Sequence, residues 1–447
     1  MKKKSEPTTF PVLFPNAAGI DIGSKEHYVA VRPDIDPNPV RSFGTFTDDL
    51  IDICEWLDQC GVTTVAMEAT GVYWVSLYLL LEQRGVEVVL VNARHVKNVR
   101  GKKTDVSDAD WIRQLHSCGL LSASFQPDAF TRELRAYMRH RKNLIEMSAS
   151  HILMIQKGFE QMNIKLHLVL TDITGKSGQA IIKAIINGER NIEKLYDLVD
   201  QRVKAKRDDI LKALRGNWKE EHLFQINQSY EGYLFYRRMI EECDKKIEEL
   251  LKKKTTYKSH PEIKEKNPRS NLNNLNFNAS TLLAEITGID LTKIFGIRAS
   301  TAIEIISEVG LDLNKWPTEK HFTSWLNLSP NNKKTGGKVI SSRTRKKKNK
   351  AGQAFKAAAN AIQRSKHWLA SFYQRIKQKG GAGKAITATA RKLAIIFYRM
   401  LKNKVEFNPI PIEVYSQMYK EQKIRKLKST ASRLGFNVIE RERTQVT

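Results

Sequence analysis

The order of strand-like and helix-like segments between residues 17 and 125 limits most strongly what this chain can fold into. Three short apolar segments come first, and turns of hairpin length join them, which predicts three strands. From Asp48 onward, segments with apolar residues at helical spacing alternate with strand-like runs, in the order helix, strand, helix, strand, helix. This order predicts a mixed α/β sheet covered by helices on both faces.

The first and fourth predicted strands each contain one isolated carboxylate. Asp21 lies in the middle of "AAGIDIGS", between Gly19 and Gly23, and Glu68 lies among apolar residues in "VAMEAT". A charge buried in a core strand is costly unless a partner compensates it. The first question that the sequence raises is therefore what compensates Asp21.

Two further acids lie on the last predicted helix of this region. Asp105 and Asp108, in "KTDVSDAD", are three residues apart and share one face of the helix, whereas Asp110 points elsewhere and is expected to be a surface acid. In a sheet of the ribonuclease H type, the first strand, the fourth strand and the last helix are neighbours. In that arrangement Asp21, Glu68, Asp105 and Asp108 surround one point.

Four carboxylates cannot all ionise in one cleft unless cations are present. Their oxygens are hard ligands that suit Mg²⁺ or Mn²⁺, and two such ions position a nucleophile and stabilise the leaving oxygen in phosphoryl transfer. Taken alone, Asp105 also fits an acid that favours a helix N-terminus, and Glu68 fits a solvent-facing acid at a strand end. The order of the elements, with all four acids in register, favours a divalent-metal site.

The positive charge of the chain is large and concentrated. The formal net charge is +27, and between Lys333 and Lys350 nine of eighteen residues are Lys or Arg while none is acidic. Clustered positive charge is typical of proteins that bind a polyanion, so the sequence predicts a nucleic-acid partner. A solvated basic patch with no site is the alternative.

The segments after the sheet predict a mainly helical remainder. One long charged helix is expected from Arg132 to Gly158, in a solvated helical hairpin or a dimer-forming coiled coil. Residues 282–310 predict two helices around a turn with Gly296, either a helix-hairpin-helix that contacts phosphates or an ordinary helical hairpin. Two amphipathic helices then follow, at 353–378 and 383–402.

We expect six segments along the chain, and none of them in a membrane. They are a basic N-terminal tail (1–16), a catalytic α/β domain (17–130), a helical or coiled-coil insert for oligomerisation (131–254), a polar linker (255–278), a C-terminal domain with a helix-hairpin-helix-like start and a basic loop (279–414), and a charged C-terminal tail (415–447). No apolar run approaches the roughly 18 residues of a membrane span, and no signal peptide opens the chain. Four scattered cysteines without a CxxC pair indicate a reducing compartment and no zinc module.

Four motifs in this order resemble the insertion-sequence family 110 transposases. They are "GIDIGSKEHYVAV", "VAMEATGVYW", "VVLVNARHVKNVRGKKTDVSDADWIRQL" and "WLNLSPNNKKTGGKVISSRTRKKKNKAGQAFKAAANAI". The resemblance covers nearly the whole chain, more weakly over residues 150–280. It implies a ribonuclease-H/resolvase-like domain whose Asp-Glu-Asp-Asp set is Asp21, Glu68, Asp105 and Asp108, joined to a C-terminal transposase domain of the serine type.

The resemblance also implies partners for this chain. Members of the family recombine donor and target DNA under the direction of a structured bridge RNA that the element encodes. Strand exchange holds several DNA ends at once, so a homo-oligomer, a dimer or a tetramer, is expected. A prokaryotic cytoplasmic location follows, at the nucleoid when the protein is on DNA.

One position departs from the family pattern. Where the family has a nucleophilic serine, this chain has Thr335 in "KKTGGK", and the β-branched side chain crowds attack on phosphorus. The serines that follow, Ser341 and Ser342, are alternative nucleophiles. Gly336 and Gly337 let the backbone approach a phosphate, and the cations expected to neutralise the strand are Lys333, Lys334, Lys338, Arg343, Arg345, Lys346, Lys347 and Lys348.

Three other functions fit parts of the sequence. A metal-dependent junction-resolvase-like nuclease would use the same acids with water as the nucleophile. A sugar-kinase or actin-like ATPase also opens on a "GIDIGS"-like strand, but it needs a second phosphate loop, which the sequence lacks. An RNA-binding protein with an inactive acidic site is the third. The sequence favours a DNA transposase or recombinase over all three.

Overall fold

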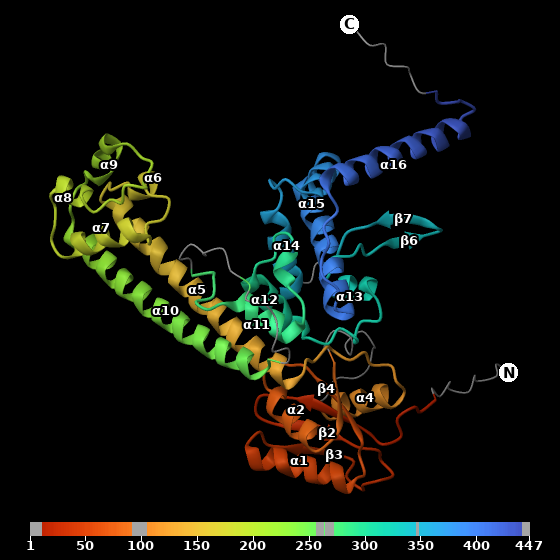
Figure 1. Ribbon diagram of the computed structural model, residues 1–447. Helices are drawn as coiled ribbons and strands as arrows, with labels where there is room; N and C mark the ends of the chain where they lie inside the picture. Colours follow the sequence, from red (N-terminus) through yellow and green to blue (C-terminus); the bar gives the residue numbers. More distant parts are fainter. Residues whose placement is uncertain (1–10, 92–104, 256–262, 264–271, 346–347, 440–447) are drawn as a thin grey trace. The chain divides into compact units, whose positions relative to one another are not determined.

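The computed structural model describes residues 11–91, 105–255, 263, 272–345 and 348–439 (Figure 1), without the side chains of 105–107. The chain divides into two compact units, residues 1–126 and 127–447. In the part of the chain described, no helix is both long and apolar enough to cross a membrane.

The N-terminal unit is built on one five-stranded mixed sheet, as the sequence predicts. Its strands are β1 (Ala17–Ile22), β2 (His27–Ala30), β3 (Val40–Phe43), β4 (Thr64–Glu68) and β5 (Glu87–Val91), in the order β3-β2-β1-β4-β5. The hairpin-joined strands β1, β2 and β3 pair antiparallel, whereas β4 pairs parallel with both β1 and β5. The helices of this unit are α1 (Thr47–Gln59), α2 (Trp74–Gln83) and α4 (Asp105–Ser117).

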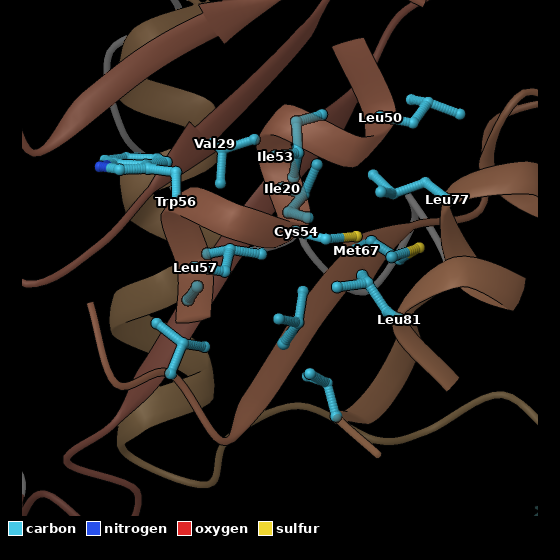
Figure 2. Close-up of a cluster of buried hydrophobic side chains, with 14 of the residues drawn as sticks. Ile20, Val29, Leu50, Ile53, Cys54, Trp56, Leu57, Met67, Leu77 and Leu81 are labelled. Atoms are coloured by element: carbon cyan, nitrogen blue, oxygen red, sulfur yellow. The ribbon is translucent and has the colours of Figure 1, made fainter. Parts of the chain in front are cut away.

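The two faces of this sheet have different cores. Ile20 and Met67 point to one face and pack with Leu57 of α1 and Leu81 of α2 (Figure 2). Because successive strand residues point to opposite faces, Ala66 lies on the other face, where it forms a smaller cluster with residues that include Ile112 of α4. α1 and α2 therefore cover one face, and α4 covers the other.

The first half of the C-terminal unit consists of two long helices. α5 (Ala129–Gln161) and α10 (Glu220–Lys253) pack along each other (Figure 1), and four short helices connect them: α6 (Leu166–Val169), α7 (Lys176–Ile186), α8 (Ile192–Tyr196) and α9 (Arg207–Leu214). A buried ion pair joins the long helices, with 2.5 Å from Arg141 Nε to Asp244 Oδ1. Arg141 also donates to the carbonyl of Asn274 at 2.7 Å, so the described end of the polar segment 255–278 is held against the helices.

The second half of this unit is mainly helical, with one small hairpin. Its elements are α11 (Ala279–Thr287), the 3₁₀ helix η1 (Leu291–Lys293), α12 (Ala299–Val309), α13 (Glu319–Trp325), β6 (Lys333–Thr335), β7 (Lys338–Ser341), α14 (Lys350–Ala361), α15 (Trp368–Asn403) and α16 (Ile412–Arg433). α14 packs against both α12 and α15.

The expected single helix over 353–378 is wrong. The chain leaves helical geometry after α14 and begins α15 at Trp368, with His367 as the N-cap residue. The ring of His367 stacks on Phe295, with 4.0 Å between the ring centroids. A contact with a residue from a much earlier segment accompanies this break, and the local pattern could not reveal it. α15 itself is interrupted at Gly381, where φ is +79°.

Candidate active site

The pairing of β1 with β4 brings Asp21 and Glu68 together. The two strands are parallel, and the last pair in their register is Ile20 opposite Met67. The next step of the same register sets Asp21 beside Glu68, on strands that lie about 4.8 Å apart. Since residues level with each other on parallel strands share a face, both carboxylates are on the face opposite Ile20, which is the face covered by α4.

Gly19 fixes the position of α4 on this face. A Cβ atom at Gly19 would collide with the backbone of α4, at the carbonyl oxygen of Ala109 and the amide nitrogen of Arg113. Only a glycine lets the helix backbone approach the strand so closely. Lower on the same face, Thr64 Oγ1 lies 2.9 Å from Nε2 of His116 on α4. These two contacts fix the direction of α4: it runs antiparallel to β1 and β4.

This direction determines which turn of α4 lies near the two strand acids. Asp21 is two strand residues beyond Gly19, a rise of about 6.6 Å. Four residues back along α4 from the turn that contacts Gly19, a rise of about 6 Å, is the turn that contains Asp105 and Asp108. The backbone therefore sets the start of α4 at the level of Asp21 and Glu68. Asp108 is half-buried, whereas the side chain of Asp105 lies outside the described residues.

The neighbours of these acids include groups that the sequence patterns did not point to. Thr70, two residues after β4, donates a hydrogen bond from its hydroxyl to Glu68 Oε1 at 3.2 Å. Asp110 accepts from Arg113 Nε at 2.8 Å and from Gln114 Nε2 at 2.6 Å, so its carboxylate is occupied along the helix. Thr70 is near a predicted strand end, and that position was the only signal for it in the sequence.

The described side chains do not by themselves form a metal centre. Among them, no group of three or more His, Cys, Asp or Glu side chains lies close enough to hold one metal ion. The chemistry of the donor set nevertheless fits a hard divalent cation, because all four candidates are carboxylates, and both strand acids lie on one face. The backbone brings Asp21, Glu68 and the start of α4 to one level, and the structure does not show the closed ligand set.

The predicted hydroxyl lies in the other unit, on the β6–β7 hairpin. Thr335 ends β6 and pairs with Lys338, the first residue of β7, so Gly336 and Gly337 form a two-residue turn. Their φ angles are +53° and +77°, and two positive φ angles are what a tight hairpin turn of this twist requires. The glycines thus have a structural reason that is independent of phosphate contact. Ser341 lies at the far end of β7, opposite Lys333.

The hairpin and the residues after it are largely exposed. All residues from 331 to 340 are exposed, including Lys333, Lys334, Thr335 and Lys338, and so are Ser342, Arg343, Arg345 and Lys348. Lys346 and Lys347 lie outside the described residues. No acidic residue lies in this segment, so its cations are available to a polyanion.

The segment predicted around Gly296 forms a turn that leads into α12. Gly296 is exposed and has φ of +77°, and a Cβ atom there would collide with the side chain of Ile362. η1 precedes this turn, so the two α-helices α11 and α12 are joined by a 3₁₀ helix as well as by the turn. The exposed side chains of Lys293 and Arg298 flank it.

Comparison with known proteins identifies the class. A family model described as "Transposase", of the DEDD type of IS110, matches residues 18–164, and a model described as "Transposase IS116/IS110/IS902 family" matches residues 279–374. Both matches define a transposase, an enzyme of DNA transposition and recombination. Together they span more than half of the chain, which belongs to the IS110 family of transposases, as its motifs indicate. No curated protein matches the chain.

The matched regions include all the candidate residues. The first match contains Asp21, Glu68, Asp105 and Asp108, and its DEDD type suggests the use of a divalent metal. The second match contains the hairpin with Thr335 and the basic residues after it.

Proposed function

We propose that this transposase cuts and rejoins donor and target DNA with a divalent-metal acidic cluster and a hydroxyl nucleophile, under the direction of an element-encoded bridge RNA. The observation that supports it most strongly is the register of β1 and β4, because that register sets two of the four acids side by side under the start of α4. Mg²⁺ is the proposed cofactor, with Mn²⁺ as the alternative.

We propose a ribonuclease-H-like fold for the α/β domain, residues 17–130. Three antiparallel strands joined as hairpins, with two further strands added in parallel beside the first, support this proposal. So does the helix α4 on the face with the acids, since that fold places its last helix beside the first and fourth strands.

In the proposed reaction, Asp21, Glu68, Asp105 and Asp108 hold the metal. When bound, the metal stabilises negative charge on the scissile phosphate and its leaving oxygen. The oxygen of the Thr335 hydroxyl forms a bond to phosphorus and loses its proton, while the bond from phosphorus to a deoxyribose oxygen breaks and that oxygen takes up a proton. The result is a covalent protein–DNA ester. A hydroxyl at the end of the incoming DNA strand then attacks the same phosphorus, and the Thr335 hydroxyl is released.

The nucleic acid is held, in this proposal, by the basic hairpin region and by the turn at Gly296. The cations from Lys333 to Lys348 neutralise phosphates, and the amides at the start of α12 contact the nucleic-acid backbone in the manner of a helix-hairpin-helix. We also propose that residues 131–254 mediate a dimer or tetramer. Large apolar side chains are exposed along α5, including Leu153 and Met154, and such side chains favour burial against a partner.

The acidic set is tested by isosteric neutralisation. Asp21→Asn, Glu68→Gln, Asp105→Asn and Asp108→Asn should each lower strand cleavage by about a thousandfold or more, because each removes a ligand oxygen charge. Melting temperatures in metal-free buffer should hold or rise, since each change removes repulsion between carboxylates. Glu87→Gln, on the exposed end of β5, is the matched control and should leave cleavage unchanged. A clear loss of stability without metal would make these acids structural.

The hydroxyl is tested by trapping the adduct. Thr335→Ala should stop cleavage without weakening DNA or RNA binding, and Thr335→Ser should keep or raise activity, because it removes the methyl group that crowds attack. Peptide mapping of the trapped species should place the DNA within "KKTGGK". A link at Ser341 or Ser342 would move the nucleophile along the hairpin. Cleavage by Thr335→Ala with no adduct would instead favour the junction-resolvase-like nuclease, with water as the nucleophile.

A further inference from the structure

A cavity between α15 and α16 contains none of the residues proposed for catalysis. Its volume is about 820 Å³, and its lining combines flat rings with cations. The principal residues are the aromatic Trp368, Tyr415 and Tyr419 and the cationic Arg375, Arg425 and Lys426. A space lined by both rings and positive charge is chemically unlike the exposed β6–β7 hairpin, where the cations stand without aromatic side chains.

The cations of this lining are not neutralised by acids. Among the described residues, no carboxylate forms an ion pair with Arg375, Arg425 or Lys426. Glu421 is the one acid of the lining, and its Oε1 accepts a hydrogen bond from Gln417 at 3.1 Å. Unneutralised cations beside a cavity attract a ligand with negative charge, such as a phosphate diester.

Aromatic rings and a guanidinium group lie next to each other in the lining of this cavity. The rings of Trp368 and Tyr415 are 5.4 Å apart between centroids, and the guanidinium carbon of Arg375 lies 4.1 Å from the centroid of Tyr419. A ring and a guanidinium plane are the two kinds of surface on which an unpaired base stacks. The indole Nε1 of Trp368 is buried and donates no hydrogen bond within the described part of the chain, although a buried donor normally has an acceptor.

α16 is weakly anchored to the rest of its unit. None of its 22 residues is fully buried, and it has six basic residues against two acidic ones. Most helices in proteins are stabilised by packing of one face, so this helix lacks the usual source of stability. A ligand that filled the space between α15 and α16 would supply the missing contacts.

We infer that this cavity binds an unpaired nucleotide of a single strand. Arg375 and Tyr419 stack on each other, so the base stacks against the outer face of this pair, and its neighbouring phosphates bind Arg425 and Lys426. Stacking accepts every base, so the site holds a strand without reading its sequence. This inference rests on the proposed nucleic-acid partners, but it depends neither on the metal site nor on Thr335.

The test compares a DNA strand and an RNA strand that have bases with a DNA strand that has none. Binding of the full chain to oligothymidylate, oligouridylate and an abasic deoxyribose strand of equal length is measured by fluorescence anisotropy, at one salt concentration and without divalent metal. Tyr419→Ala should weaken binding of the strands with bases about tenfold, while binding of the abasic strand is unchanged. Tyr419→Phe should retain parental binding, because it keeps the ring. Phe224→Ala, an exposed aromatic residue on α10, is the control and should change nothing.

A tenfold loss with the DNA strand alone, with the RNA strand alone or with both supports the site and identifies the strand it accepts. Equal affinity of the parent for the abasic strand and the strands with bases would overturn the inference, and so would a Tyr419→Ala protein with parental binding. A Glu68→Gln protein should keep the base-dependent binding, so a failure of this site and a failure of the proposed catalytic site give different results.

Discussion

The acidic residues and the proposed hydroxyl are presented by opposite kinds of structure. Asp21 and Glu68 lie on neighbouring strands of a packed sheet, and the backbone of α4 rests directly on Gly19 of the same face. Thr335 lies at a two-residue turn of a hairpin whose residues are exposed from 333 to 340. A metal-ligand set needs a rigid scaffold, because several charges must be held close together. A nucleophile that must reach a phosphate can be carried on a projecting hairpin, where the bound DNA completes its position.

The largest effect on stability is expected from a side chain placed at Gly19, where β1 and the backbone of α4 are in close contact. In Gly19→Val the new side chain collides with the backbone of α4, which cannot move without disturbing the sheet face. We expect destabilisation by about 3 kcal/mol in urea unfolding, together with loss of DNA cleavage, since α4 also carries Asp108. Gly383→Ala, where a Cβ atom meets nothing within 4 Å, is the control and should not destabilise. Parental stability in Gly19→Val would show that α4 does not rest on β1.

The basic segment that follows the β6–β7 hairpin should affect nucleic-acid binding through its charge. Replacing Lys346, Lys347 and Lys348 together by alanine should lower the slope of log affinity against log salt by about 0.7–0.9 for each phosphate that the protein no longer neutralises. Affinity for unrelated DNA sequences should fall equally, because binding to phosphates carries no sequence information. The matched control is another run of three lysines, Lys252, Lys253 and Lys254 at the end of α10, whose replacement should leave the slope unchanged. If both triple variants gave the same slope, Lys346, Lys347 and Lys348 would be solvated surface residues that bind no phosphate.

A smaller and more local effect is expected at the hairpin turn. Gly336 has φ of +53°, which asparagine adopts readily and valine does not. Gly336→Asn should therefore retain the covalent protein–DNA adduct, whereas Gly336→Val should lower its yield while the urea midpoint of the whole protein changes little. A global loss of stability in Gly336→Val would mean that the hairpin is part of the packed unit, and the contrast with the sheet would disappear.

The smallest effect on stability is expected from protonation of the buried His116 on α4. Burial lowers the pKa of His116 below its usual value near 6.5, so the folded chain stays neutral there while the unfolded chain takes up a proton. Stability from this group is complete above pH 6.5 and is lost as the pH falls below it. His116→Gln should reduce the fall in melting temperature between pH 7.5 and 5.5, though not remove it, since burial also lowers the pKa of His27. An equal fall in melting temperature in His116→Gln and in the parent would contradict this role of His116.

The sequence predicted the acids of the sheet domain and the Thr335 hairpin to different extents. The acids were identified because charges are rare in apolar strands, and their motifs matched a family. That Asp21 adjoins Glu68 depended on the strand register, and the close approach of α4 at Gly19 left no mark in the local pattern. On the other side, "TGG" suggested a phosphate contact, whereas the positive φ angles of both glycines show that the turn itself requires them.

By itself, the sequence determined the order of the elements in the sheet domain, because apolar spacing with periods of 2 and 3.6 residues is a local property. It also determined the location of the positive charge and, through its motifs, the transposase family. Only the tertiary structure showed where the expected helix over 353–378 breaks, at a point where His367 stacks on Phe295 from a distant segment. It also decided which faces meet and which glycine has no room for a side chain. Those features arise from contacts between segments far apart in the chain, and a local pattern contains no record of its distant neighbours.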